Sequence, residues 1–256
     1  MSIGSGIEWT DATWNPTTGC RKVSPGCDHC YAATLARRLK AMGNRRYQND
    51  GPDGPGFGLT LHEDKVAEPL RWRSPRRVFV NSMSDLFHAN VPELFIASVF
   101  VTMAACPQHH FQILTKRPKR MQRVVSTLPG DLRALPNVWL GVSIENDDYT
   151  WRADFLRRTP ASVRFLSLEP LLGPLPSLSV DKIDWVIVGG ESGPFARHMA
   201  IAWARNLRDQ CLERGVPFFL KQLGGVRNKR GGDAATLDGA RWHQFPAPSE
   251  SARPPA

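Results

Sequence analysis

Three cysteines, Cys20, Cys27 and Cys30, lie within eleven residues in a C-x6-C-x2-C arrangement. Cys27 and Cys30 are three positions apart, so a single turn points both sulfurs in the same direction. Gly19 and the Pro25-Gly26 pair allow the backbone to fold Cys20 back towards them. Three converging thiolates are the ligands of a metal site, and they leave it one protein ligand short of a closed tetrahedron.

The missing fourth ligand separates the possible metals. Structural zinc takes four protein ligands, whereas an iron–sulfur cluster held by three cysteines leaves one iron open for chemistry. The spacing therefore favours a cluster, and zinc is the alternative, with His29, His62 or another histidine as its fourth ligand. Inert packing and a disulfide scaffold fit less well, because the loop is polar and we expect no secretory signal in this 256-residue chain.

The elements that must hold this loop alternate between strands and helices. Short apolar runs predict strands, and helical patterns lie between them. Strands are predicted at 78–83, 111–115, 138–144, 163–168, 184–188 and 216–221, and helices at 92–106, 119–128, 149–157 and 202–214. An opening strand near 7–9 leads into the cysteine loop, and the helix at 31–42 follows it. Cys106 and Cys211 stand alone in apolar helical stretches and are predicted core residues.

The predicted strands are apolar throughout, which is typical of a parallel sheet with both faces covered. With about seven strands, we predict an α/β fold over residues 1–225. Its form is a partial (open) β/α barrel of about six to seven parallel strands, rather than a doubly wound sheet. The cysteine loop occupies 15–31, and the Gly/Pro-rich segment 44–70 is predicted to be an irregular loop. Residues 226–256 are expected to form a small hairpin around Asp238-Gly239 and a disordered tail.

Polar side chains follow the predicted strands at their carboxyl ends, the edge where parallel β/α folds build their sites. The segments are Asn81-Ser82-Met83-Ser84-Asp85, Thr115-Lys116-Arg117, Ser143-Ile144-Glu145-Asn146, Ser167-Leu168-Glu169-Pro170, Gly189-Gly190-Glu191-Ser192-Gly193 and Lys221-Gln222. Each alone has a structural explanation, such as a helix cap, a surface acid or a tight turn. Their recurrence on the edge that carries three cysteines predicts a site there.

The chain is basic, with 33 Lys and Arg against 24 Asp and Glu, a net charge of +9 and a pI of about 9.7. The cations cluster at 37–38, 45–46, 71–77, 116–120 and 227–230, some beside aromatic residues. Such clusters suit a polyanion such as nucleic acid, and a solvated basic face is the alternative. No run approaches the roughly 18 apolar residues of a membrane span, so we expect no membrane association and a cytoplasmic location. No Rossmann, P-loop or H-E-x-x-H motif is present, which argues against a nucleoside triphosphatase and a zinc protease.

Several motifs together resemble a three-cysteine-motif family of phages and bacteria, over roughly residues 5–246. The motifs are the cysteine loop ending in Cys30-Tyr31, Asn81-Ser82-Met83-Ser84-Asp85-Leu86-Phe87, Leu114-Thr115-Lys116-Arg117-Pro118, Gly141-Val142-Ser143-Ile144-Glu145, Leu168-Glu169-Pro170-Leu171, Val188-Gly189-Gly190-Glu191-Ser192-Gly193 and the ending Leu237-Asp238-Gly239 with Trp242-His243. That family is similar to radical S-adenosylmethionine enzymes and, more remotely, to the spore photoproduct lyase branch that repairs DNA.

The resemblance implies a radical-SAM-like partial barrel with a [4Fe-4S] cluster on Cys20, Cys27 and Cys30. It further implies S-adenosylmethionine at the open iron and an electron donor such as flavodoxin or ferredoxin. The residues it places around the cofactor are Ser84, Asp85, Lys116, Ser143, Glu145, Glu169, Gly190 and Glu191, and the candidate catalytic residues are Tyr31, Lys116 and Glu169. The commonest radical enzymes space their cysteines x3 and x2 with an aromatic residue before the third, whereas here the first spacing is x6 and His29 precedes the third.

The leading hypothesis is a radical S-adenosylmethionine-type enzyme that modifies or repairs nucleic acid, or a nucleoside, through a 5′-deoxyadenosyl radical. A non-catalytic nucleic-acid-binding protein whose loop is held by zinc or a structural cluster is the first alternative. A radical enzyme that acts on a small molecule is the second.

Overall fold

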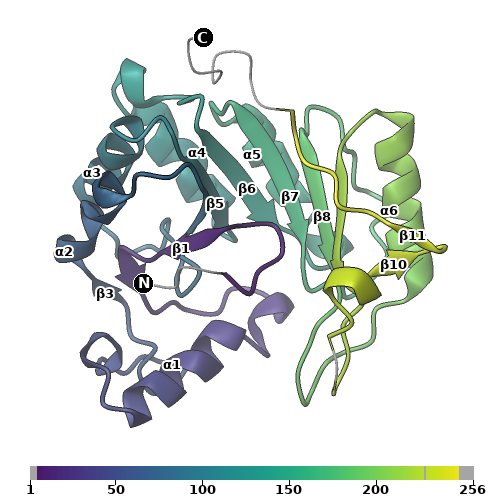
Figure 1. The fold of residues 1–256 in the computed structure, drawn as a ribbon, viewed down its shortest axis with the longest axis horizontal. Coiled ribbons are helices and arrows are strands. Elements are labelled where there is room, and N and C mark those ends of the chain that lie inside the picture. Colours follow the sequence, from purple (N-terminus) through teal and green to yellow (C-terminus); the bar gives the residue numbers. More distant parts are fainter. Residues whose placement is uncertain (1–4, 228, 248–256) are drawn as a thin grey trace.

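The computed structural model describes residues 5–227 and 229–247. Within them, the main sheet has seven parallel strands and curls into an open half-barrel (Figure 1). The order across the sheet is β1 (Ala12–Trp14), β4 (Arg77–Val80), β5 (His110–Thr115), β6 (Val138–Ser143), β7 (Val163–Leu168), β8 (Trp185–Gly189) and β9 (Phe218–Gln222). The predicted α/β partial barrel is therefore confirmed.

Helices that connect successive strands cover the convex face of this sheet (Figure 1). They are α3 (Glu93–Ala104), α4 (Pro118–Thr127), α5 (Trp151–Arg158) and α6 (Ile201–Glu213). Their apolar faces and the outward-facing strand residues form one large core. Cys106 and Cys211 are 1% and 0% exposed in that core, as the sequence predicts.

Aromatic side chains fill the concave face in the amino-terminal half of the barrel. The layer consists of Trp9, Phe79, Trp139, Phe165, Trp185 and Phe219, together with two aliphatic residues. The rings of Trp185 and Trp139 meet edge to face with centroids 5.9 Å apart. A side chain at Gly141 would place its Cβ 2.4 Å from the Phe165 ring, so only glycine leaves room for that ring. Because the concave face is filled here, the strands read as apolar on both sides.

The inward-facing side chains become polar towards the carboxyl ends of the strands. Successive strand residues face opposite sides of the sheet, so Ser143 lies on the same face as Trp139, and Ser167 on the same face as Phe165. Ser143 and Ser167 are partners in the register between β6 and β7. Lys221 follows Phe219 in the same way on β9. The half-barrel thus has an aromatic base and a polar mouth.

The opening strand lies later than the sequence predicts. Residues 7–9 form a bend and turn, and the first strand is β1, whose Ala12 pairs with Val78 of β4. The apolar character of residues 7–9 reflects packing instead of pairing, because Trp9 inserts into the aromatic layer with its ring 4.8 Å from that of Phe79.

Segment 44–70, predicted as an irregular loop, contains short regular elements. They are two 3-10 turns, Arg45–Tyr47 and Glu68–Arg71, with β3 (Thr60–Leu61) and α2 (Glu63–Val66) between them. Strand β3 pairs antiparallel with β2 (Thr17–Thr18), which directly precedes the cysteine loop. The irregular part is the Gly/Pro-rich stretch before β3.

Helix α1 (Tyr31–Ala41) lies apart from the convex helix layer, at the lower edge of the molecule in Figure 1. It packs through Ala32 and Ala36 against Tyr47, Phe57 and Met83. The cysteine loop and segment 44–70 therefore support each other through a small core of their own.

Near the C-terminus, β10 (Thr236–Leu237) and β11 (Ala240–Arg241) pair antiparallel around Asp238-Gly239. The predicted disordered tail falls on 248–256, outside the described residues. Within the described part of the chain, no helix combines the length and apolar character that a membrane crossing requires.

Candidate functional site

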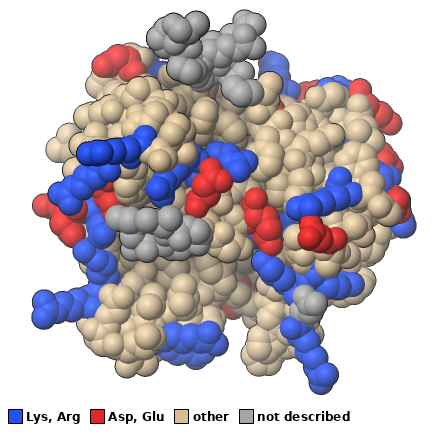
Figure 2. Space-filling model, in the orientation of Figure 1, with Lys and Arg blue, Asp and Glu red and all other residues tan. Residues whose placement is uncertain are grey.

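An open cavity of about 370 Å³ lies at the carboxyl ends of the strands. This volume falls among small-molecule and cofactor sites, which measure about 300–1,000 Å³. Trp9 and Phe79 of the aromatic layer line its base. In Figure 2 the molecule is hollowed below its centre, between α1 and the loops that follow β8 and β9, and Lys and Arg side chains lie on both sides of the hollow.

The structure brings the predicted site residues to the wall of this cavity, with one exception. The lining includes Cys20, Cys27, Cys30, Tyr31, Ser84, Asp85, Lys116, Ser143, Glu169, Gly190 and Glu191. Glu145 is the exception and lies behind the wall. Residues separated by more than 170 positions in the chain therefore meet in one place, because parallel strands bring all their carboxyl ends to one edge.

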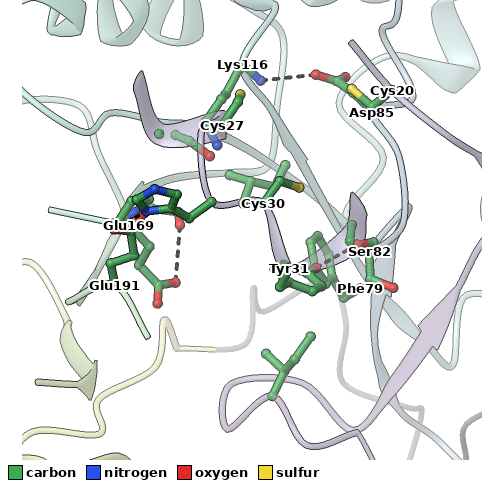
Figure 3. A pocket seen from close by; sticks show the side chains of 18 of the residues that line it. Cys20, Cys27, Cys30, Tyr31, Phe79, Ser82, Asp85, Lys116, Glu169 and Glu191 are labelled. Carbon is green, nitrogen blue, oxygen red and sulfur yellow. Dashed lines mark hydrogen bonds and ion pairs between the residues drawn. The ribbon is translucent and has the colours of Figure 1, made fainter. Parts of the chain in front are cut away.

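Tight backbone approaches set the course of the cysteine loop. Gly19 has a φ of 82°, and a Cβ there would lie 2.1 Å from the carbonyl oxygen of Gly58. Cys27 ends a 3-10 turn, Pro25–Cys27, and Cys30 is the N-terminal capping residue of α1. Figure 3 shows the three sulfurs at separate positions around the cavity.

The three sulfurs share a cavity, but they do not converge on one point as the sequence predicts. Among the described residues, no three His, Cys, Asp or Glu side chains are grouped closely enough to hold a single metal ion. In a cluster each cysteine binds a different iron, so the three thiols surround a common space and need not meet at one point. Cys20, Cys27 and Cys30 line one cavity and none forms a disulfide, so this donor set fits a cluster.

The environment of Cys20 favours the neutral thiol. Burial, together with the negative charge of Asp85, raises the pKa of this thiol to about 12, although Arg117 opposes both effects. A bound metal takes cysteine as the thiolate, so loading this site releases a proton from Cys20.

Asp85 joins the ends of two strands. Its carboxylate accepts hydrogen bonds from the Thr115 hydroxyl at 2.8 and 2.9 Å, and from the backbone N–H groups of Phe87 and Lys116 at 2.9 and 3.2 Å. The Arg117 guanidinium lies 3.8 Å away and donates to the Arg21 carbonyl in the cysteine loop. Asp85 lines the cavity, but its oxygens are engaged in holding the cavity wall together.

Glu191 and Arg197 join the loop after β8 to the cysteine loop. Arg197 donates to both Glu191 carboxylate oxygens, at 2.6 and 2.9 Å, and to the Pro25 carbonyl at 2.9 Å. His29 Nδ1 lies 3.0 Å from the same carboxylate. Burial would raise the pKa of Glu191, but the hydrogen bonds from Arg197 and His29 outweigh it and lower the pKa to about 2.

The histidines considered as zinc ligands have other partners. His29 faces Glu191, as described, and the Nε2 atom of His62 lies 2.9 Å from the Thr18 hydroxyl. His62 is buried beside β2 and is not part of the cavity lining. Both rings therefore take part in fixing the backbone around the cysteine loop.

Glu145 forms a buried ion pair behind the cysteine loop. Its Oε2 atom lies 3.0 Å from Nη1 of Arg152, and the two side chains are 0% and 2% exposed. Arg152 also donates to the Ser143 carbonyl at 2.8 Å and lies over the Tyr149 ring. A Cβ at Gly26 would meet the Glu145 side chain at 3.2 Å, so the loop lies directly on this pair.

Glu169 and Lys221 form an ion pair inside the cavity, with Oε1 and Nζ 2.9 Å apart. The Ser167 hydroxyl donates to the other carboxylate oxygen at 3.3 Å. A Cβ at Gly189 would lie 2.5 Å from Glu169 Oε1, so glycine is needed where the carboxylate crosses β8. These groups provide charged and hydroxyl contacts for a polar ligand.

The remaining predicted residues are held by backbone contacts. The Ser84 hydroxyl donates to the Thr17 carbonyl at 2.8 Å, and the Tyr31 hydroxyl donates to the Ser82 carbonyl at 2.6 Å (Figure 3). Gly190 lies so near β9 that a Cβ would be 2.3 Å from the Leu223 carbonyl oxygen. Packing against the end of β9 therefore explains why this position is a glycine.

Sequence reasoning placed Ser167 and Lys221 among the polar strand ends without giving them a role, and it did not place Lys229 or Arg197 at the site. Ser167, Lys221 and Lys229 line the cavity, and Arg197 fixes its rim. Strand alternation alone identifies Ser167 and Lys221, which are two positions after Phe165 and Phe219. Arg197 lies in a loop without periodicity, so no comparable pattern identifies it.

Residues 4–246 of the chain match a family described as protein of unknown function (DUF5131). No protein of curated function matches. Two solved structures are similar to the fold. One is a cysteine-to-serine mutant of spore photoproduct lyase, with 12% identity, a TM-score of 0.48 and coverage of 88% of this chain and 59% of that one. The other is spore photoproduct lyase complexed with dinucleoside spore photoproduct, with 13% identity, a TM-score of 0.43 and coverage of 80% and 54%. This chain thus spans little more than half of either.

Proposed function

This chain belongs to the DUF5131 family, and we propose that it is a radical S-adenosylmethionine-type enzyme that modifies or repairs nucleic acid or a nucleoside. The proposal draws in part on the resemblance of the chain's motifs to the three-cysteine-motif family. One observation carries it: Cys20, Cys27 and Cys30 line the same cavity as the polar groups at the carboxyl ends of the strands.

The cysteines are the proposed ligands of a [4Fe-4S] cluster that leaves one iron open for S-adenosylmethionine. A cluster held by Cys20, Cys27 and Cys30, with a donor such as flavodoxin or ferredoxin, would supply one-electron reductive cleavage of S-adenosylmethionine. That chemistry would give a 5′-deoxyadenosyl radical able to take a hydrogen atom from the substrate. Every other task belongs to the protein: it must bind the cofactor, orient the substrate and exclude water.

Charged and hydroxyl groups on the cavity wall suit the methionine and ribose parts of the cofactor. The Glu169–Lys221 pair offers a carboxylate and an ammonium group 2.9 Å apart, and Ser143 and Ser167 offer hydroxyls beside them. The proposed cofactor-binding residues are Ser84, Asp85, Lys116, Ser143, Glu145, Glu169, Gly190 and Glu191. Asp85 and Glu145 act by fixing the wall, because their carboxylates are bound to protein groups.

The aromatic layer supports the exclusion of water. Trp9 and Phe79 close the cavity below, and both are nearly fully buried. Tyr31, the residue after Cys30, has its hydroxyl fixed on the Ser82 carbonyl and stays a candidate catalytic residue together with Lys116 and Glu169. The net charge of +9 supports a nucleic-acid substrate, because cations attract the phosphate backbone.

Anaerobic purification followed by iron and sulfide analysis tests the proposal. We expect brown protein with about four irons per chain. Addition of S-adenosylmethionine and a reductant should then release methionine and 5′-deoxyadenosine. Colourless protein with a single zinc would favour the non-catalytic alternative. A loaded cluster that never cleaves the cofactor would mark the cluster as structural.

A further inference from the structure

A second hollow lies beside the cavity, along the start of α4 and α5. It measures about 310 Å³, and we call it the basic groove, defined by Lys116, Lys119, Arg120, Tyr149 and Trp151. Lys116 and Val23 line both hollows. A ligand seated in the basic groove therefore lies next to whatever occupies the cavity.

The basic groove carries positive charge that acids neutralise only in part. Five of its eleven lining residues are Lys or Arg, and none is Asp or Glu. Arg117 pairs with Asp85. Arg152 pairs with Glu145. Within the described part of the chain, the other three cations, Lys116, Lys119 and Arg120, have no carboxylate at ion-pair distance. Arg120 donates to the backbone carbonyls of His88 and Val91, which fix the guanidinium and leave its charge uncompensated. A groove of one charge sign attracts a ligand of the other sign.

An aromatic side chain lies among these cations. Trp151 remains 39% exposed, and the Lys119 ammonium is held 5.2 Å from the centre of its ring. Sites for single-stranded nucleic acid combine cations, which follow the phosphates, with aromatic rings on which bases stack. The basic groove has both features, with cations in the first turn of α4 and the aromatic ring in the first turn of α5.

We propose that the basic groove binds the nucleotide that adjoins the target nucleotide of a nucleic-acid strand. Lys119 and Arg120 contact its phosphates, and its base stacks on Trp151, while the target nucleotide enters the cavity past Lys116. The inference rests on the proposed function, because it takes nucleic acid as the substrate. It adds a recognition site outside the cavity that selects a strand over a free nucleoside.

Fluorescence anisotropy tests this with the cluster-loaded protein and a labelled single-stranded DNA of about 12 nucleotides. We expect Trp151→Ala to weaken binding about tenfold and Trp151→Phe, which keeps a ring, to stay within about threefold of wild type. Lys119→Ala should weaken binding several-fold and make the negative slope of log K against log salt shallower by about 0.7. Lys182→Ala is the matched control, because this exposed cation lies outside the basic clusters and precedes β8 at the opposite end of the sheet.

Two outcomes overturn the inference. One is an equal, small effect of Lys119→Ala, Trp151→Ala and Lys182→Ala, which would mean that binding depends only on overall charge. The other is a cluster-loaded wild-type protein that binds no DNA. Iron content and cofactor cleavage, measured without DNA on the same preparations, decide the proposed function separately. If the cofactor is cleaved normally but DNA binding does not depend on the basic groove, only the groove proposal is rejected. If DNA binding depends on the groove but the cofactor is not cleaved, only the proposed radical chemistry is rejected.

Discussion

The guanidinium of Arg197 donates two hydrogen bonds to the carboxylate of Glu191, at 2.6 and 2.9 Å. The same guanidinium reaches the Pro25 carbonyl, 172 positions earlier in the chain, and the Asp28 carboxylate at 3.4 Å. Both Pro25 and Asp28 lie in the cysteine loop. One arginine therefore connects the rim after β8 to the segment that presents the proposed cluster ligands.

Arg197→Ala should loosen the cysteine loop. The change leaves the Glu191 carboxylate, 6% exposed, without its main partner, which we expect to cost about 1–3 kcal/mol of unfolding free energy. Urea denaturation measures this cost. The rate of iron loss to a chelator measures how firmly the cysteine loop holds its metal. Arg205→Ala, which removes an exposed ion pair to Asp238, is the control and should leave iron loss unchanged. Equal iron loss in both variants would contradict the role assigned to Arg197.

The Glu191 carboxylate should make stability depend on pH in acid. Its pKa is about 2 in the folded protein and about 4.5 in the unfolded chain, so its contribution is complete above pH 4.5 and is lost as pH falls towards 2. Glu191→Gln should therefore be less stable than wild type by about 1–3 kcal/mol at neutral pH, after allowance for solvent screening. The two proteins should converge near pH 2. Denaturation curves measured between neutral pH and pH 2 check this prediction. A stability difference between the two proteins that stays constant with pH would contradict it.

Burial on both faces made the strands readable from sequence. Runs such as Trp185–Gly189 are apolar because the aromatic layer covers the concave side while helices cover the convex side. The polar strand ends could be predicted for the same reason, since polarity returns only where the cavity begins. The opening strand was missed because Trp9 is apolar for its place in the aromatic layer and not for pairing.

Contacts between loops were beyond sequence reasoning. Glu145 follows the end of β6 at Ser143, so strand alternation no longer fixes its direction, and its partner Arg152 comes from the next helix. The link between Arg197 and Pro25 joins two irregular segments without a periodic pattern. The three cysteines were predictable as a set, whereas their separate positions around the cavity depend on the packing of Gly19 and Gly26.

Gly19→Ala should disrupt the start of the cysteine loop. Its Cβ would lie 2.1 Å from the Gly58 carbonyl oxygen, on a backbone whose φ of 82° already disfavours a side chain. We expect a loss of roughly 2–4 kcal/mol in unfolding free energy, together with poor iron loading. Gly43→Ala is a matched control, since φ there is 74° but nothing lies within 4 Å. This control isolates the cost of placing a side chain on a backbone with positive φ, which is about 1–2 kcal/mol. Equal effects would show that the contact with Gly58 does not matter.

Cys27→Ala should abolish cluster retention, because two cysteines alone cannot hold three of the four irons. Anaerobic reconstitution followed by iron and sulfide analysis measures the loss. Cys211→Ala is the control, since Cys211 is 0% exposed in the core and belongs to no predicted ligand set. It should keep about four irons per chain despite some loss of stability. A fully loaded Cys27→Ala protein would refute the ligand assignment.

The buried pair of Glu145 and Arg152 should show strong coupling in a double-mutant cycle. Arg152→Met leaves the Glu145 carboxylate, 0% exposed, without its cation, and we expect a loss of about 3–5 kcal/mol in unfolding free energy. The double variant with Arg152→Met and Glu145→Leu removes both charges and fills the space, so it should recover most of that loss. Because Gly26 lies against Glu145, iron loading should recover together with stability. Single changes that simply add would show that the two side chains are independent, and recovered stability without iron loading would assign Glu145 a role at the cofactor itself.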